Sequence, residues 1–383
     1  MSEVSDADRV ERLRELFPVT RRWAYLNHAG IGPMPRLAAG AVGAVVAGAV
    51  EDGDRRWPER NAGVEEARGL VARLLGARDL GSVAFTENTS AALSLVAEGL
   101  DWQAGDNVVG AACEFPSNVY PSMNLGRRGV ELRLAPEVDG RVPLEEIAAR
   151  VDGRTRAVAL SWVEYASGFR VDLGRIGELC RERGALFVVD AIQGLGALRL
   201  DVEAVPVDAV AAAAHKWLLG PEGVAVLWLG PRALDRLVPV RAGWRSMRHM
   251  FDWDGLELDF PDAARAWECG TLNSMGIHAL GESVRLLLEL GPEAVERRVL
   301  ALADRVADGA GLAGWTVASP RGATERSGIV SLSREGVEAR EVAERLAAQG
   351  IVVADRAGRL RVSPHVYNTE EEVDRALAAL AES

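Results

Sequence analysis

The stretches ALFVVDAIQG, residues 185–194, and AVAAAAHKW, residues 209–217, decide the fold of this chain. Each begins with a short apolar run, the pattern of a strand that is buried on both faces of a parallel sheet. The first run ends at Asp190, and the second ends near His215 and Lys216. Ligands of open α/β sheets bind beyond the carboxyl ends of the strands. The two stretches therefore predict an α/β domain with a polar site at one edge of its sheet.

The same alternation of an apolar run and a helical pattern continues on both sides of these stretches. Further apolar runs occupy residues 83–85, 107–112, 157–162 and 224–229, and helical patterns follow most of them. This alternation is typical of a mainly parallel sheet covered by helices on both faces.

The last third of the chain has a different pattern, in which short strands come in pairs between helices. We expect a smaller α+β domain there, with helices at 293–310, at 339–349 and from 369 onward. We therefore divide the chain into an N-terminal segment, 1–60, that packs with the small domain, a large domain, 61–285, and a small C-terminal domain, 286–383.

Composition excludes several classes of function. The 383 residues carry a net charge of −12 and no Lys/Arg-rich run, which argues against a nucleic-acid or anionic-membrane partner. The three cysteines form no C-x-x-C pair, so neither a disulfide framework nor a structural zinc site is expected. The N-terminus lacks an apolar signal sequence, and the stretch 37–50 is shorter than the ~20 residues that span a bilayer. We expect a cytoplasmic protein without a bound metal.

Lys216 and Asp190 are the residues that most directly indicate chemistry. A lysine at the end of an apolar strand can reach toward solvent, or it can form a Schiff base with a carbonyl when burial lowers its pKa. Asp190 can cap a helix, or it can keep a pyridinium nitrogen protonated. The combination of both at strand ends favours pyridoxal phosphate (PLP).

A third polar cluster is the stretch FTENTSAA, residues 85–92, where a strand turns into a helix. Thr89 and Ser90 lie at the helix N-terminus, which either is simply capped there or holds a phosphate. His215 could add a donor to the same phosphate. No G-x-G-x-x-G pattern follows a predicted strand and no Walker pattern is present, so dinucleotides and nucleoside triphosphates are not favoured.

Seven motifs along the chain resemble those of the class V aminotransferase family of fold-type I PLP enzymes. This group includes cysteine desulfurases, selenocysteine lyases and isopenicillin N epimerase. The resemblance implies a large PLP-binding domain with a mainly parallel seven-stranded sheet between helices, plus a smaller α+β domain. The motifs are YLNHAGIGPMP (25–35), FTENTSAALSLVAEGL (85–100), EFPSNVYP (114–121), FVVDAIQGLGALRLDV (187–202), AHKW (214–217), WECGTLN (267–273) and RVSPHVYNTEEEVD (361–374).

The resemblance also implies the residues that hold the cofactor. Lys216 would bond to PLP and shuttle the proton, Asp190 would pair with the pyridine nitrogen, and Gln193 would contact the phenolic oxygen. The phosphate would be held by a set of hydroxyl and imidazole groups: Thr89, Ser90 and His215.

Further roles follow from the same resemblance. Phe115 would stack on the cofactor ring, and Thr271 would reach the phosphate of the neighbouring subunit in a homodimer. Arg361 would grip the carboxylate of an amino-acid substrate, which suits a guanidinium fork. Asn27 and His28 would line the substrate entrance.

The sequence departs from the family pattern at two places. Desulfurases of this family carry a mobile cysteine upstream of the carboxylate arginine, whereas residues 350–361 contain none. Many relatives place a phosphate-binding hydroxyl where this chain has Ala213. The first departure disfavours a persulfide relay, and the second removes one phosphate contact.

Several residues keep an open role at this point. Cys113 and Cys269 lie near the expected site without a clear function, and Cys180 fits a helix core. Arg170 and Arg245 could serve a second substrate carboxylate or the surface. Either Tyr165 or Ser167 occupies the region where desulfurases place a cofactor contact. We expect His249 and His278 to be structural.

The leading hypothesis is a PLP-dependent lyase that eliminates a sulfur-type leaving group from a cysteine-like amino acid without a persulfide cysteine. The competing hypotheses are an aminotransferase or amino-acid epimerase, and a specialised decarboxylase or C–C lyase. A last hypothesis is a non-catalytic protein that keeps the fold, against which the intact Lys216, Asp190 and Arg361 argue.

Overall fold

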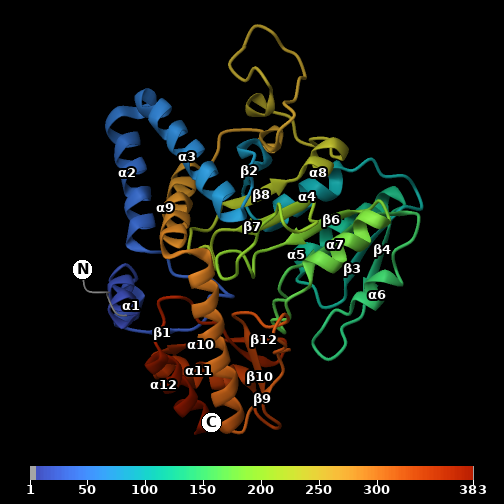
Figure 1. Cartoon of the computed structure of the whole chain (residues 1–383). Coiled ribbons are helices and arrows are strands. Elements are labelled where there is room, and N and C mark those ends of the chain that lie inside the picture. The colour runs from blue at the N-terminus through green and yellow to red at the C-terminus, as the bar shows by residue number, and fades with distance from the viewer. Residues whose placement is uncertain (1–5, 383) are drawn as a thin grey trace.

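The computed structural model describes residues 6–382, and its largest element is a seven-stranded sheet (Figure 1). The strand order is β2-β8-β7-β6-β5-β3-β4, in which β8 is antiparallel to both neighbours and the other pairs are parallel. The predicted mainly parallel α/β sheet is thus confirmed. The strands are β2 (Val83–Thr86), β3 (Asn107–Ala111), β4 (Glu131–Ala135), β5 (Thr155–Ser161), β6 (Leu186–Asp190), β7 (Ala209–Ala213) and β8 (Ala225–Leu229).

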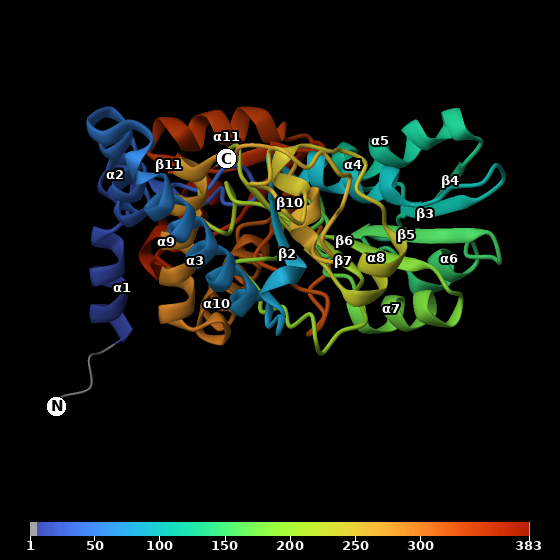
Figure 2. The same ribbon diagram turned by 90° about the horizontal axis from the view of Figure 1, so that it is seen from above.

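Helices cover both faces of this sheet, which explains why its central strands are apolar throughout (Figure 2). On β6, Leu186 and Val188 pack on the same side as α4 (Thr89–Gly99), whereas Phe187 and Val189 pack on the opposite side with α7 (Leu173–Glu182). Successive strand residues point to opposite faces, so burial on both sides requires an unbroken apolar run. The remaining helices of this region are α5 (Pro116–Asn124), α6 (Leu144–Ala148) and α8 (Pro231–Arg236).

The N-terminal segment is shared between the two parts of the molecule, which differs from the prediction that it packs with the small domain. Only its first part does so: β1 (Ala24–Tyr25) pairs with β11 (Ile351–Val352). Helices α2 (Arg36–Asp52) and α3 (Trp57–Leu75) instead pack along α9 (Ser274–Leu290). The predicted domain limits at 60 and 285 fall inside the continuous helices α3 and α9. Within residues 6–382, no helix is long and apolar enough to cross a membrane.

The C-terminal part is a small α+β unit, as predicted. Helices α10 (Pro292–Leu312), α11 (Ala339–Ala348) and α12 (Glu370–Ala381) pack on an antiparallel sheet of order β12-β13-β10-β9. Its strands are β9 (Thr316–Val317), β10 (Val330–Ser333), β12 (Ala354–Arg356) and β13 (Arg359–Val362), while α1 (Asp6–Glu15) lies at the N-terminal end of the described chain.

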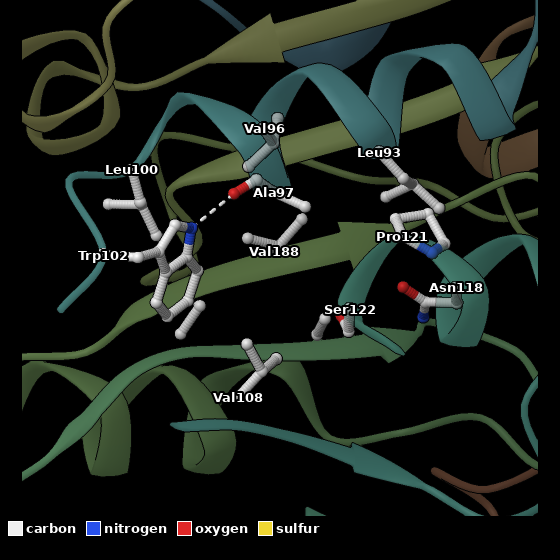
Figure 3. Close-up of a pocket in the computed structure, with 12 residues that line it drawn as sticks. Leu93, Val96, Ala97, Leu100, Trp102, Val108, Asn118, Pro121, Ser122 and Val188 are labelled. Carbon is white, nitrogen blue, oxygen red and sulfur yellow. Dashed lines mark hydrogen bonds between the residues drawn. The ribbon is translucent and has the colours of Figure 1, made fainter. Parts of the chain in front are cut away.

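A small cavity separates α4 and α5 from the sheet (Figure 3). Its volume of about 20 Å³ is enough for one water molecule. Trp102 closes one end and donates its indole N–H to the carbonyl oxygen of Ala97. The buried side-chain amide of Asn118 lines the cavity.

Candidate active site

The carboxyl ends of β6 and β7 meet at a cavity of about 450 Å³. Asp190 ends β6, while His215 and Lys216 follow β7, and all three line this cavity. Nine of the eleven residues predicted from the sequence to form the site line it together: Asn27, Thr89, Ser90, Phe115, Asp190, Gln193, His215, Lys216 and Arg361.

Lys216 is held in an environment that raises the fraction of its neutral, nucleophilic form. Burial lowers the pKa of its ammonium group to about 8, and the charge of Asp190 opposes this shift. The Lys216 Nζ atom lies 5.8 Å from the centre of the Phe115 ring. Behind the lysine, Gly32 donates its backbone N–H to the carbonyl oxygen of His215, and a Cβ there would come within 2.4 Å of the Lys216 carbonyl oxygen. Loop 29–33 therefore fixes the lysine backbone from behind.

Asp190 is the acidic partner in the cavity. It is buried, and burial raises its pKa to about 6, while the backbone N–H of Ile192 and the charge of Lys216 stabilise the carboxylate. The hydrogen bond from Ile192 N to Asp190 Oδ1 is 3.0 Å long. The ionised form of a buried carboxylate is stabilised most when a cationic group faces it.

The N-terminus of α4 forms a second polar wall. Asn88 caps this helix by accepting the N–H of Ala91 at 2.8 Å. The Thr89 hydroxyl accepts the backbone N–H of Ala213 at 3.0 Å, which ties the helix to β7. Ser90 is bonded to Ser117 by their hydroxyl groups at 2.7 Å. A helix N-terminus surrounded by hydroxyls is a favourable place for a phosphate.

Arg361 lies at the other end of the cavity, and two of its three guanidinium nitrogens are unpaired among the described residues. Its side chain is buried, and its Nη1 atom donates to the carbonyl oxygen of Tyr165 at 2.8 Å. The Nε and Nη2 atoms are buried without a hydrogen-bond partner among the described residues. These two atoms form one edge of the guanidinium, which matches the two oxygens of a carboxylate. Leaving them unpaired is costly, so this edge is built for an anion.

Gln193 and Asn27 connect the cavity wall to the small domain. The Gln193 side chain donates to the carbonyl oxygen of Ala29 at 3.1 Å and accepts the indole N–H of Trp217 at 2.9 Å. Asn27 forms a β-bridge with Ser363, and its Oδ1 atom is buried without a partner in the described chain. The contact of Gln193 with a cofactor oxygen remains a prediction.

His28 and Thr271 are not part of this cavity. His28 is fully buried behind it, where its ring nitrogens bond to the Ser363 carbonyl oxygen at 2.9 Å and the Tyr367 hydroxyl at 2.7 Å. The structure thus gives His28 a packing position rather than the expected place at the substrate entrance. Thr271 is exposed and lines a separate cavity of about 150 Å³ next to Glu87.

The cysteines also lie outside the cavity, as does Arg170. Cys113 is half-buried, and burial next to Glu164 raises the pKa of its thiol. Cys269 lines the same cavity as Thr271. Arg170 forms an ion pair with Glu296, whose carboxylate lies 2.9 Å from its Nη1 atom, and its guanidinium lies over the ring of Trp162.

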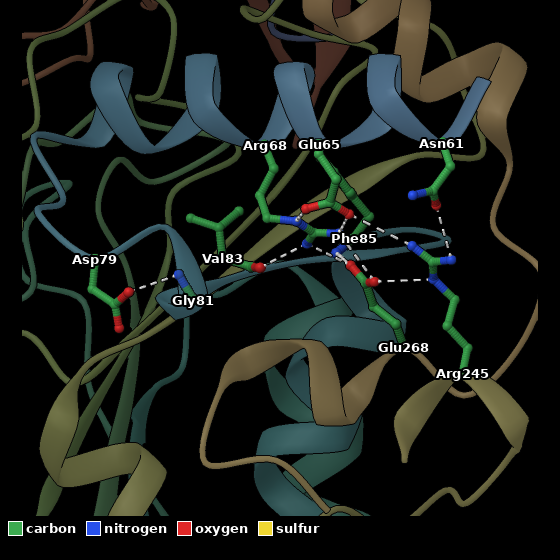
Figure 4. Close-up of polar contacts among 9 residues, drawn as sticks. All are labelled: Asn61, Glu65, Arg68, Asp79, Gly81, Val83, Phe85, Arg245 and Glu268. Carbon is green, nitrogen blue, oxygen red and sulfur yellow. Dashed lines mark hydrogen bonds and ion pairs between the residues drawn. The ribbon is translucent and has the colours of Figure 1, made fainter. Parts of the chain in front are cut away.

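Arg245 belongs to a buried ion-pair network that supports the site from outside (Figure 4). At the centre of this network, Glu268 accepts from Arg68 at 2.7 Å, from the backbone N–H of Phe85 at 2.9 Å, and from Arg245 at 3.4 Å. The network joins α3 to β2 and to the segment that carries Thr271. Arg245 therefore has a structural role rather than a role in binding a substrate.

Tyr165 and Ser167, and the histidines outside the motifs, have distinct positions in the structure. Tyr165 lines the cavity, whereas Ser167 is buried and accepts the backbone N–H of Phe169. His278 bonds to a backbone carbonyl oxygen on α3 at 3.0 Å, consistent with its expected structural role, and His249 is exposed.

Sequence reasoning missed one charged residue of the cavity, Arg356, and one strong signal. Arg356 lies at the end of β12 in a stretch that contains no motif. The missed signal is that Lys216 is the only lysine among the 44 Lys and Arg residues of the chain. Arginine can replace lysine in most surface roles but cannot act as a Schiff-base amine. A single retained lysine therefore points to chemistry.

These observations define a fold-type I PLP enzyme. A buried amine of lowered pKa, a buried acid beside it, a helix N-terminus with hydroxyls and an open guanidinium edge together fit the aldehyde, ring nitrogen and phosphate of PLP and the carboxylate of its amino-acid substrate. More particularly, the chain belongs to the class V aminotransferase family, whose model, Aminotransferase class-V, matches residues 47–376. Enzymes of this family use PLP.

Relatives of known sequence or structure agree with this assignment. The chain is 33% identical to an isopenicillin N epimerase from Streptomyces clavuligerus, with 93% of each chain covered. It is 28% identical to an uncharacterized aminotransferase, YcbU, from Bacillus subtilis, with 97% of each chain covered. The structure of a cysteine desulfurase from Thermococcus onnurineus superposes with a TM-score of 0.88 at 26% identity, covering 97% of each chain. The cystine C–S lyase C-DES, at 24% identity, has the same fold with a TM-score of 0.89 over 96% of this chain and 99% of that one.

Proposed function

We propose that this protein is a lyase that cleaves the Cβ–S bond of a cysteine-like amino acid and releases the sulfur group directly, without a persulfide cysteine. The observation that carries the proposal is that no cysteine of the described chain lines the cavity that contains Lys216. In support, this fold is shared by a cystine C–S lyase and by a cysteine desulfurase.

The stretch where the family's desulfurases carry their cysteine has a different form here. Residues 354–362 form the hairpin β12–β13, closed by Ala357 and Gly358, which both have positive φ. Two central residues with positive φ are typical of a tight two-residue hairpin turn. Such a turn holds the segment against the cavity, and its last cavity-facing residue on β12 is Arg356. A mobile sulfur carrier is therefore not expected from this segment.

The cavity residues have separate tasks in this reaction. The unused edge of Arg361 would bind the substrate carboxylate and so orient the Cα–H bond. Lys216 Nζ, whose pKa is about 8, would accept the proton from Cα. Bound PLP would supply the electron sink for this step, with Asp190 at its ring nitrogen and Thr89, Ser90 and His215 at its phosphate.

The bonds of the overall reaction balance without a further reactant except water. The Cα–H bond breaks toward Lys216, and the Cβ–S bond breaks with its electron pair leaving on sulfur. The sulfur takes a proton and departs as a thiol. Water then hydrolyses the remaining unsaturated amine to pyruvate and ammonia.

The test is a panel of S-substituted cysteines incubated with the PLP-loaded protein. The proposal predicts equimolar pyruvate and thiol, and no product from Lys216→Ala. A serine and an alanine analogue without the sulfur group serve as substrates that cannot release a thiol. Failure to release any keto acid across the panel contradicts the proposal.

The second candidate is an amino-acid epimerase. The 33% identity to isopenicillin N epimerase over 93% of each chain supports this candidate, beside a 32% identity to a probable cysteine desulfurase from Pseudomonas aeruginosa over 83% of this chain. The same panel in deuterium oxide distinguishes the two reactions. Exchange of the Cα hydrogen with inversion and without thiol release would identify an epimerase, whereas thiol release identifies the lyase.

We further propose that the protein is a homodimer in which Thr271 completes the phosphate site of the partner. The exposed position of Thr271, away from the cavity of its own chain, supports this arrangement. Exposed apolar side chains on the projecting segment 238–262 also suit an interface (Figure 1).

A further inference from the structure

The cavity contains a second guanidinium group for which the proposed reaction has no use. Arg356 lines the cavity together with Arg361. Its Nη1 atom donates to the carbonyl oxygen of Asp355 at 2.7 Å, and it forms no ion pair with any carboxylate of residues 6–382. By contrast, Arg170 and Arg245 are already paired with glutamates. Arg356 therefore presents an uncompensated positive charge.

The hairpin fixes the position of this charge relative to Arg361. In the antiparallel register, Ala354 is opposite Arg361, and Arg356 is opposite Arg359. Residues directly opposite each other share a face, as do residues two apart on one strand. Arg356 and Arg361 are thus diagonal neighbours on one face of the hairpin. Cβ atoms in such diagonal pairs are about 7 Å apart, so the two guanidinium groups can bind different groups of one ligand.

The two arginines differ in depth. Arg361 is buried at the floor, with one edge free for a carboxylate, whereas Arg356 is exposed at the rim. Asp190 is the one acidic residue among the cavity-lining residues of the described chain, and Lys216 already faces it. The charge at the rim consequently has no partner in the described part of the protein. The influence of Arg356 on Lys216 and Arg361, whose pKa values it lowers, agrees with this proximity.

We infer that Arg356 is a specificity-determining residue that selects substrates with a second carboxylate at the far end of the side chain. Arg361 binds the α-carboxylate, and Arg356 binds the distal one. This inference rests on the proposed function, which makes the substrate an amino acid with a sulfur-linked side chain. A thioether of cysteine that ends in a carboxylate has this chemistry.

The test compares two ligands that differ only in this charge: S-carboxymethylcysteine and its neutral amide, S-carbamoylmethylcysteine. Dissociation constants for the PLP-loaded protein are measured from the change in cofactor absorbance on binding. The acid is expected to bind about fivefold or more tightly than the amide, with a preference that shrinks as salt is added. Arg356→Gln should remove the preference by weakening the acid alone, and Arg356→Lys should keep part of it.

Arg340→Gln is the control, because Arg340 is an exposed arginine on α11 that does not line the cavity. It should leave both constants unchanged. Equal binding of acid and amide by the unaltered protein, or an equal loss of both in Arg356→Gln, overturns the inference. Measuring both binding and turnover distinguishes a failure of this inference from a failure of the proposed function. Arg356-dependent binding without pyruvate would refute the lyase alone, and pyruvate release without the charge preference would refute the role of Arg356 alone.

Discussion

Lys216 provides the most direct test at the scale of single residues, because the chain contains no other lysine. Burial lowers the pKa of its amine to about 8. Trace acetylation of the cofactor-free protein should therefore modify Lys216 with a midpoint near pH 8, measured by mass spectrometry of its peptide. In urea the midpoint should return to about 10.4, the value of an exposed lysine. A native midpoint near 10 would show that the amine is solvated, and the proposed role in proton transfer would lose its basis.

Glu114 gives a second residue-scale prediction, which concerns stability. It is fully buried and accepts from the backbone N–H and the hydroxyl of Ser161, and burial raises its pKa to about 7. Between pH 4.5 and 7 the unfolded chain releases a proton that the folded chain keeps. The free energy of unfolding should therefore fall as pH rises through this window, by on the order of 3 kcal/mol.

Urea unfolding from pH 4.5 to 7.5 measures this slope, and Glu114→Gln should flatten it. Part of the slope will remain, because burial also raises the pKa values of Glu164 and Asp190. An unchanged slope in Glu114→Gln would assign the pH dependence to other groups.

At the scale of elements, the ion-pair network around Glu268 holds together α3, β2 and the segment that carries Thr271. Removing one partner of a buried pair leaves an uncompensated charge. Glu268→Ala leaves the buried Arg68 and Arg245 without this partner and should lower the free energy of unfolding by about 3–5 kcal/mol. The exposed pair of Arg340 and Glu344 supplies the control, since Glu344→Ala should cost at most about 0.5 kcal/mol. Similar losses in both variants would mean that the network does not brace these elements.

The elements also show which parts of the fold a sequence can reveal. The central strands were predicted because burial on both faces forces them to be apolar throughout. The edge strand β4 was not predicted, because the charged residues Glu131 and Arg133 interrupt its apolar pattern. Helix α2 was assigned to the wrong neighbour, since its small side chains pack closely on α9 but carry no signal of the partner they contact. Local pattern reveals the type of an element but not its partner.

In the candidate site, too, local pattern predicted some residues and could not predict others. Asp190, Lys216 and Thr89 were predicted because strand ends and a helix N-terminus place them by local rules. Arg356 was missed, because only the register of the hairpin brings it beside Arg361. His28 was misplaced for a related reason: its motif lies at the cavity, but its side chain turns into the core between the two parts of the molecule.

At the scale of the whole molecule, the proposed dimer predicts that two defective chains can complement each other. Lys216→Ala removes the amine of its own site, whereas Thr271→Leu would damage only the site of its partner. Unfolding and refolding an equal mixture should place about half of the chains in mixed dimers. Each mixed dimer then has one intact site, built from the Lys216 of one chain and the Thr271 of the other. About a quarter of the sites in the preparation should bind PLP tightly and release product, although neither variant does so alone.

The outcome depends on which chain Thr271 serves. If Thr271 acted on the cavity of its own chain, every site in the mixture would lack either the lysine or the threonine, and mixing would restore nothing. A chain carrying both substitutions, mixed with Lys216→Ala, is the control, because no combination of these two chains supplies Lys216. Sedimentation of the unaltered protein tests the dimer itself. A monomer with full activity would contradict the arrangement, because the exposed Thr271 would then have no phosphate within reach.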